Sequence, residues 1–140
     1  MYIIISIINI TNIDIEEREK NGGMAREQLK TLTEPMYYIL LSLTEQRHGY
    51  GIMQAVDQMT KGRVSIGAGT LYALLGRFEK ENIIVQVRKE DRKRIYCLTS
   101  KGRQLLTEEF NRLNQLVQDG SKRFDQEGRL LPPKDGGGGA

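Results

Sequence analysis

Several residue types that usually carry chemistry are scarce or missing in this chain of 140 residues. It has one cysteine, which excludes an internal disulfide and any Cys₂ or Cys₄ zinc site. It has one histidine, His48, which removes most histidine-based metal sites and catalytic triads. Tryptophan is absent, and no apolar run reaches the roughly 18 residues of a membrane-spanning helix. We therefore expect no membrane association.

Catalytic patterns are missing as well. The sequence contains no phosphate-binding loop, no paired carboxylates and no cluster of metal ligands in a recognisable spacing. We expect a protein that is not an enzyme, with no catalytic residues, no metal and no cofactor.

Hydrophobic residues make up 39% of the chain and charged residues 28%, which is typical of a single globular domain. The net charge of +3 is unevenly distributed. Residues 1–23 have a net charge of −2, whereas residues 61–103 hold eleven Lys or Arg against four acids. Five of those eleven lie within residues 88–94. Such a basic run indicates either a polyanionic partner or an ordinary solvated face.

The two ends differ in composition from the middle. Residues 1–15 contain eight isoleucines but lack the positive region and cleavage site of a signal peptide. The local sequence of residues 1–15 favours a β-strand. Our hypothesis is that residues 1–23 are an extension that results from a mis-assigned start codon, and that Met24 is the biological start of the protein. At the other end, residues 128–140 contain Pro132, Pro133 and four consecutive glycines, which predicts a flexible tail.

Three helices are predicted between these ends. Thr33 is a favourable N-cap before Glu34 and Pro35, and the apolar residues that follow recur at helical spacing up to Leu43. A polar turn over 45–50 leads to a second helix over 50–59, with Met53 and Met59 among its buried residues. An extended piece over 64–66 precedes a third helix over 68–81, after which Asn82 favours a left-handed conformation.

A β-hairpin and a long helix follow. Residues 83–88 and 92–98 are rich in strand formers and flank a polar tip at Lys89, Glu90 and Asp91. Thr99 caps a final helix of about 20 residues, in which Leu106, Phe110, Leu113, Val117 and Phe124 form a heptad seam. This order predicts a mainly α fold of the α+β class: a winged helix-turn-helix over 24–99, with a dimerisation helix over 100–127.

The third helix shows an unusual outer face. If its leucines and Phe78 face the core, the opposite face presents Gly69, Ala73, Gly76 and Lys80, flanked by Thr70, Tyr72 and Arg77. Glycine inside a helix costs up to about 1 kcal/mol relative to alanine, so two glycines there need a reason. One reason is close approach to a DNA major groove. The alternative is a solvent face that happens to be small.

Three strings resemble the PadR-like family of winged helix-turn-helix transcriptional regulators, in its small subfamily with a short C-terminal part. They are His48–Ile52, Gly69–Ile84 and Arg92–Gly102. The resemblance covers about residues 29–117 and implies a homodimeric repressor that dimerises through its first and last helices. The positions that match the family's motifs imply that Tyr50, Thr70 and Tyr72 contact DNA, and that Arg92 and Arg94 contact DNA from the wing.

The complete set of expected contacts combines these arguments. For double-stranded DNA it is Tyr50, Ser65, Gly69, Thr70, Tyr72, Ala73, Gly76, Arg77, Lys80, Lys89, Arg92, Lys93 and Arg94. For dimerisation it is Met36, Tyr37, Leu40, Leu106, Phe110, Leu113, Val117 and Phe124.

The expected function is repression at a pseudo-palindromic operator, with helix 68–81 in the major groove and wing 88–94 on the backbone or minor groove. Localisation would be cytoplasmic, with nucleoid association on binding. The resemblance leaves open the binding of a small hydrophobic effector. Because the chain has no tryptophan, the sequence does not predict a site in which tryptophan rings stack on a bound drug. The alternative function is a winged-helix module that binds protein and not DNA.

A few residues allow two interpretations. Tyr37 and Tyr38 would face either a pocket or the dimer seam, and Met36, Met53 and Met59 would line either the core or an adaptable pocket. We expect His48 to be a turn residue. We expect Cys97 to be buried and inert on its strand, since nothing in the sequence lowers its pKa.

Overall fold

The computed structural model describes residues 31–135, and the chain divides into two compact units, one ending at Glu109 and the other beginning at Phe110. Each unit is described by itself. The expectations about residues 1–23 and Met24, and about the last five residues of the tail, lie outside the described residues.

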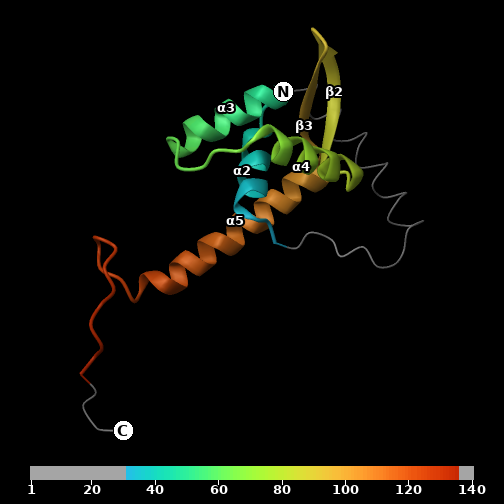
Figure 1. Ribbon diagram of the computed structural model, residues 1–140. Coiled ribbons are helices and arrows are strands. Elements are labelled where there is room, and N and C mark those ends of the chain that lie inside the picture. Colours follow the sequence, from blue (N-terminus) through green and yellow to red (C-terminus); the bar gives the residue numbers. More distant parts are fainter. Residues whose placement is uncertain (1–30, 136–140) are drawn as a thin grey trace. The chain divides into compact units, whose positions relative to one another are not determined.

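The first unit is built from three helices, a small sheet and the start of a fourth helix (Figure 1). Its elements are α2 (Glu34–Ser42), β1 (Arg47–His48), α3 (Gly49–Thr60), α4 (Ala68–Lys80), β2 (Ile84–Glu90), β3 (Lys93–Leu98) and the first half of α5 (Ser100–Ser121). The α+β winged helix-turn-helix order predicted from the sequence is confirmed.

Side chains at the helix starts account for where the first helices begin. The backbone N–H of Met36 donates to the Thr33 hydroxyl at 3.5 Å, as the sequence predicts for an N-cap. The imidazole Nδ1 of His48 accepts the backbone N–H of Gly51 at 3.0 Å. His48 is therefore the N-cap of α3, which begins one residue earlier than predicted.

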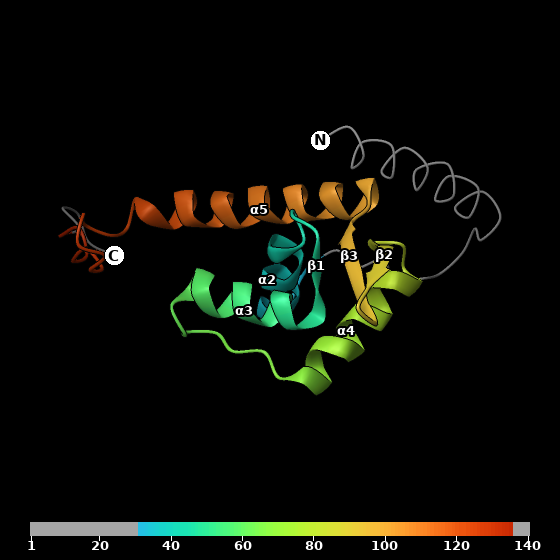
Figure 2. The same cartoon turned by 90° about the horizontal axis from the view of Figure 1, so that it is seen from above.

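The sheet has three antiparallel strands in the order β1-β3-β2, where the sequence predicted only the β2–β3 hairpin (Figure 2). Arg47 pairs with Tyr96 and His48 with Ile95, so the polar turn before α3 supplies an edge strand. A strand of two residues has no periodicity to detect. The extended piece predicted over 64–66 forms no strand.

One hydrophobic core joins the helices and the inner face of the sheet. Ile39, Ile52, Leu71, Phe78 and Leu98 are fully buried in it. Met59, predicted to be buried on the second helix, is 47% exposed. It is the last methionine before the helix end, where Lys61 adopts a left-handed conformation and the chain leaves the core.

The end of β3 and the start of α5 are tied to the residues that follow α4. The Thr99 hydroxyl donates to the carbonyl of Asn82 at 2.6 Å and accepts the N–H of Gly102 at 3.0 Å. The Thr99 N–H donates to the Ile83 carbonyl at 3.0 Å. Thr99 thus caps α5, as predicted, and also fixes the chain that enters β2. Asn82 has the positive φ predicted for it, at 60°.

The described part of the second unit contains the second half of α5 and a tight turn over 123–131. The N–H of Asp125 donates to the Arg129 carbonyl, and the N–H of Leu131 donates to the Arg123 carbonyl, each at 2.8 Å. Gly128 has a φ of 78°, which lets the chain reverse. The helix expected over 100–127 therefore ends at Ser121, and the start of the expected tail, 128–131, belongs to this turn.

Gly102 provides a test of the close contact between the start of α5 and the residues that follow α4. A Cβ at this position would lie 2.1 Å from the Ile83 carbonyl oxygen, whereas a Cβ at Gly120, in the same helix, would meet no atom within 4 Å. We expect Gly102→Ala to lower the free energy of unfolding by about 3 kcal/mol through overpacking. Gly120→Ala should be neutral or stabilising by up to about 1 kcal/mol. Urea unfolding of both variants measures the difference, and equal effects would show that the junction tolerates a side chain.

Candidate nucleic-acid interface

The outer face of α4 is open to solvent. Gly69, Ala73 and Gly76 are exposed, and a Cβ built on either glycine would meet no atom of the described chain within 4 Å. Packing inside the chain therefore does not require glycine at these positions. Their helix-weakening effect is then unexplained unless something outside the chain approaches this face closely.

Tyr72 connects α4 with the start of α3. Its side chain is 57% exposed, yet its hydroxyl would lie only 2.8 Å from a Cβ at Gly49. The absent side chain at Gly49 thus leaves the space in which the phenol rests. Sequence reasoning identified Tyr72 but missed Gly49, because the two residues meet only in the folded chain.

A second exposed tyrosine lies at the start of α3. The rings of Tyr50 and His48 are nearly parallel, with centroids 6.5 Å apart. Since His48 is held by its bond to Gly51, the stacked ring gives Tyr50 a fixed support. The two phenol groups, from α3 and α4, are both available for hydrogen bonds to a partner.

The hairpin turn is shifted from the position that the sequence predicts. Lys89 and Glu90 belong to β2, and the two-residue turn is Asp91-Arg92, with φ values of 46° and 66°. Two positive φ values define a type I′ turn, which suits the twist of a two-stranded hairpin. Arg92 therefore occupies the tip, in a conformation that costs a residue other than glycine about 1–2 kcal/mol.

The register separates the basic residues of the wing onto two faces. A bulge after Gln86 is followed by the pairs Arg88↔Ile95, Lys89↔Arg94 and Glu90↔Lys93. Paired residues lie on the same face, and successive residues alternate. Lys89 and Arg94 therefore share one face, and Arg88 and Lys93 the other.

The face with Lys89 and Arg94 is the one turned toward α4. The guanidinium of Arg94 lies close enough to the phenol of Tyr96 to affect its pKa, and Tyr96 is buried in the core together with residues of α4. Burial raises the pKa of Tyr96, the negative charge of Glu79 on α4 adds to this, and Arg94 opposes it. Lys89 and Arg94 lie directly opposite each other, and like charges so placed repel unless an anion lies between them.

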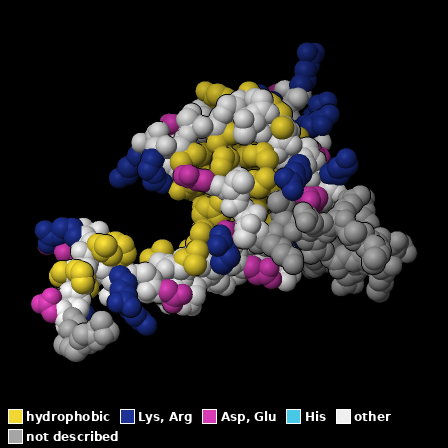
Figure 3. All heavy atoms as spheres, turned by 60° about the horizontal axis from the view of Figure 1, so that its bottom comes forward, with side chains coloured by type: hydrophobic (Ala, Val, Ile, Leu, Met, Phe, Trp, Pro, Cys, Tyr) yellow, Lys and Arg dark blue, Asp and Glu magenta, His cyan; other side chains and the backbone are white. Residues whose placement is uncertain are grey.

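On the other face, Arg88 is paired with an acid, whereas Lys93 is not. Arg88 donates from its Nε to Glu90 at 2.6 Å and also bonds to Gln46, before β1. Within residues 31–135, no ion pair is formed by Lys89, Arg92, Lys93 or Arg94. In Figure 3 dark blue side chains project from the upper right, where the hairpin ends.

All thirteen predicted DNA contacts are exposed in the structure. Lys89 and Arg94 share one face of the wing, Lys93 lies on its other face, and Arg92 lies in the turn at the hairpin tip. The Arg77 Nε lies 3.5 Å from a carboxylate oxygen of Glu81, whose side chain is 19% exposed, so this ion pair is partly buried. Gln46, which orients Arg88, was not predicted and has no sequence signal.

The residues predicted for dimerisation divide into two groups. Met36, Leu40 and Leu106 lie in the core of the first unit, and Tyr37 is half-buried against Tyr38. In the second unit Phe110, Val117 and Phe124 are exposed and Leu113 is half-buried. The exposed apolar part of the predicted set is thus on the second half of α5 and just beyond it.

Cys97 is buried on β3, and burial raises the pKa of its thiol, an effect that nearby Arg103 opposes. A buried thiol with a raised pKa is a poor nucleophile. Across residues 31–135 no group of three or more potential metal ligands comes together. No helix in the same range is long and apolar enough to span a membrane.

Helix α4 after a short turn from α3, with a basic β2–β3 wing beside it, defines a winged helix-turn-helix of the DNA-binding class. Residues 39–108, half of the chain, match the model of the transcriptional regulator PadR-like family. The chain belongs to this family, whose members are DNA-binding regulators of transcription and not enzymes.

Similar proteins are found in several bacteria. A 37.1 kDa transposon protein of Streptomyces fradiae is 36% identical over 69 residues, which are 49% of this chain and 19% of that protein. The Escherichia coli transcriptional regulator YqjI is 26% identical over 102 residues, which are 72% of this chain and 49% of YqjI. The chain thus spans half or less of these two relatives.

Solved structures share the fold. A transcriptional regulator from Clostridium thermocellum is 24% identical with a TM-score of 0.53, covering 61% of this chain and 89% of its own. A PadR family regulator from Eggerthella lenta is 17% identical with a TM-score of 0.54, and the match covers 86% of this chain and 93% of that regulator. At these identities the likeness concerns the fold.

The hairpin tip allows a test of the turn. Because Arg92 has a positive φ, we expect Arg92→Gly to raise the free energy of unfolding by about 1 kcal/mol. Lys93→Gly, one residue later in extended backbone, removes a similar charge and should destabilise instead. Thermal unfolding of the two variants checks the sign of each change. A loss of stability on Arg92→Gly would contradict the I′ turn.

The contact between Gly49 and Tyr72 allows another test. Gly49→Ala should push the exposed Tyr72 ring aside with little cost to folding, because the phenol is free to move toward solvent. We expect the Tyr72 ring resonances to shift in NMR spectra and DNA affinity to fall, with thermal stability nearly unchanged. Gly67→Ala, where a Cβ meets nothing, is the matched control. Unchanged Tyr72 resonances in Gly49→Ala would disprove the contact.

Proposed function

We propose that this chain is a homodimeric repressor that binds a pseudo-palindromic operator with α4 in the major groove and the wing on the adjacent backbone or minor groove. The observation that carries the proposal is the combination of an exposed α4 face of small side chains with a basic wing. Lys89, Arg92 and Arg94 of the wing are exposed and form no ion pairs among the described residues.

This surface has the properties that groove binding needs. Gly69, Ala73 and Gly76 let the helix axis approach base edges, while Thr70 and Arg77 at its border can hydrogen-bond to bases or phosphates. Tyr50 and Tyr72 add phenol donors, and Ser65 and Lys80 extend the polar border. Lys89 and Arg94 repel each other in the free protein, so a phosphate between them would relieve that repulsion.

The homodimer rests on the apolar side chains of α5 and on the family resemblance. Phe110, Leu113 and Val117 on α5 recur at intervals of three and four residues, as in a helix seam that pairs with another helix, and Phe124 follows in the turn after the helix. Two copies of α4 would enter successive major grooves about 34 Å apart, which predicts half-sites about one helical turn apart.

Two finer parts of the proposal follow from the resemblance. As a regulator of transcription the protein would act in the cytoplasm, on the nucleoid. A small hydrophobic molecule would release it from the operator, which is tested by adding a flat hydrophobic dye to the protein–DNA complex. The alternative, a winged-helix module that binds protein, predicts association that is insensitive to salt and no affinity for DNA.

Fluorescence anisotropy with DNA from the gene's own promoter tests the proposal. The wild-type chain should prefer the promoter over random DNA, and log K should fall steeply with log salt concentration, by about 0.9 per neutralised phosphate. Lys89→Ala with Arg94→Ala should flatten this slope by about 1.8 on both DNAs if each residue contacts one phosphate.

The two faces of the hairpin supply a matched control. Arg88→Ala with Lys93→Ala removes the same charge from the face away from α4 and should change the slope far less. Equal slopes for the two double variants would refute the assignment of the DNA-facing side. A folded wild-type protein with no salt-dependent DNA affinity would refute DNA binding itself and favour the protein-binding module.

A further inference from the structure

The tip of the wing projects into solvent. Residues 88–94 are all exposed, and the far end of the β2–β3 hairpin lies away from the helices in Figure 1. The turn at the tip has positive φ values at Asp91 and Arg92, which costs free energy at residues other than glycine. A two-stranded hairpin without packing against other elements is marginally stable in water. A defined position of the tip therefore needs a contact with another part of the chain.

Arg88 supplies such a contact. Its guanidinium donates a hydrogen bond to the side-chain oxygen of Gln46, which lies 42 residues earlier in the chain, directly before β1. Its Nε donates to the carboxylate of Glu90 at 2.6 Å. These three residues, which we call the Arg88 network, join the outer part of the wing to a segment outside the hairpin.

The β-bulge in β2 determines the face on which Arg88 lies. The register shifts by one residue between Gln86 and Arg88, so that Arg88 pairs with Ile95. In an unbroken register Arg88 would pair with Arg94, on the face turned toward α4. The extra residue places the Arg88 side chain on the other face instead, where it reaches both of its acceptors. The bulge thus assigns Arg88 to the network and leaves the basic pair on the opposite face to a partner.

Gln46 lies in a segment that is fixed at several points. The next residue, Arg47, belongs to β1, which pairs with β3. The Arg47 Nε donates to the carbonyl of Ser42, the last residue of α2, at 2.9 Å. His48 then caps α3. The acceptor for Arg88 is therefore carried by a segment that is tied to two helices and to the sheet.

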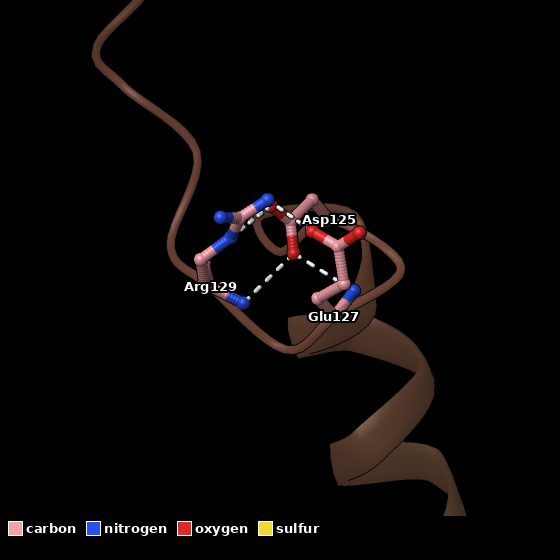
Figure 4. Close-up of polar contacts among 3 residues, drawn as sticks. All are labelled: Asp125, Glu127 and Arg129. Atoms are coloured by element: carbon pink, nitrogen blue, oxygen red, sulfur yellow. Dashed lines mark hydrogen bonds and ion pairs between the residues drawn. The ribbon is translucent and has the colours of Figure 1, made fainter.

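A polar network in the second unit has a shorter reach. The Arg129 Nε donates to the carboxylate of Asp125 at 2.9 Å, and Arg129 also pairs with Glu127 (Figure 4). Asp125 accepts two backbone N–H groups of the same turn, so these bonds hold that turn. The bond from Arg88 to Gln46 differs because it joins residues that are distant in the sequence, and it therefore restricts how the wing is oriented on the first unit.

We propose that Gln46 is a positioning residue of the wing: by binding Arg88, it holds the basic side chains of the tip in the orientation in which they meet DNA. This inference rests on the proposed DNA binding and gives Gln46 a role without a contact to DNA. A wing that is mobile in the free protein must become ordered when it binds. Loss of the bond therefore weakens the complex without removing a phosphate contact.

Backbone ¹⁵N relaxation of the free full-length chain tests the network. Gln46→Met keeps the length of the side chain but removes the acceptor, so the order parameters of residues 89–93 should fall while those of α4 stay unchanged. Gln46→Glu keeps an acceptor for Arg88 and should retain the order of the wild type. Gln58→Met makes the same change at an exposed position of α3 and is the control. Unchanged order at residues 89–93 in Gln46→Met would refute the network.

Fluorescence anisotropy tests the consequence for DNA binding. Gln46→Met should raise the dissociation constant for promoter DNA about fivefold, as expected for the loss of one hydrogen bond. The slope against log salt concentration should not change, because no charge is removed. Gln58→Met should match the wild type in both measurements.

The outcomes separate this inference from the proposed function. If the wild type binds DNA and Gln46→Met binds equally well, the positioning role is refuted and DNA binding stands. If Gln46→Met flattens the salt slope, Gln46 affects the phosphate contacts themselves, and the positioning role is again refuted. If the wild type does not bind DNA, both fail, and the relaxation data then show only whether the network orders the wing.

Discussion

The carbonyl group of Ile83 is the point on which the arrangement of the first unit depends. It lies between α4 and β2, and it accepts the N–H of Thr99 at the end of β3. Gly102, in the first turn of α5, lies against the same oxygen so closely that no side chain fits. One peptide group thus joins α4, the wing and α5, so a shift of any of them requires the others to move.

This constraint explains how a small domain holds its proposed DNA surface in place. The side chains of α4 that face outward make few contacts within the chain, so their positions follow from the buried face of Leu71, Leu75 and Phe78. The wing is held at its base by the hydrogen bonds of Thr99 and further along β3 by Tyr96, whose side chain is buried in the core. Tyr72 and Tyr50 are placed by contacts with another element, Tyr72 over Gly49 and Tyr50 against the ring of His48.

Much of the fold could be predicted from local signals. The caps at Thr33 and Thr99, the left-handed Asn82 and the helical spacing of α4 all act within a few residues, and the structure agrees with them. Pairing between distant residues could not be predicted. Strand β1 exists because Arg47 and His48 meet β3, and the turn moved to Asp91-Arg92 because the pairing of β2 with β3 sets the register. The division of the wing charges into two faces, and the role of Gly49, follow from the same long-range contacts.

The cap of α3 also determines the chemistry of the only histidine. Because Nδ1 of His48 accepts the N–H of Gly51, the proton of the neutral ring resides on Nε2. In this tautomer neither ring nitrogen offers a free lone pair: one is occupied by the backbone, and the other carries hydrogen. As long as α3 keeps its first turn, His48 can serve neither as a metal ligand nor as a base, although its ring is partly exposed to solvent.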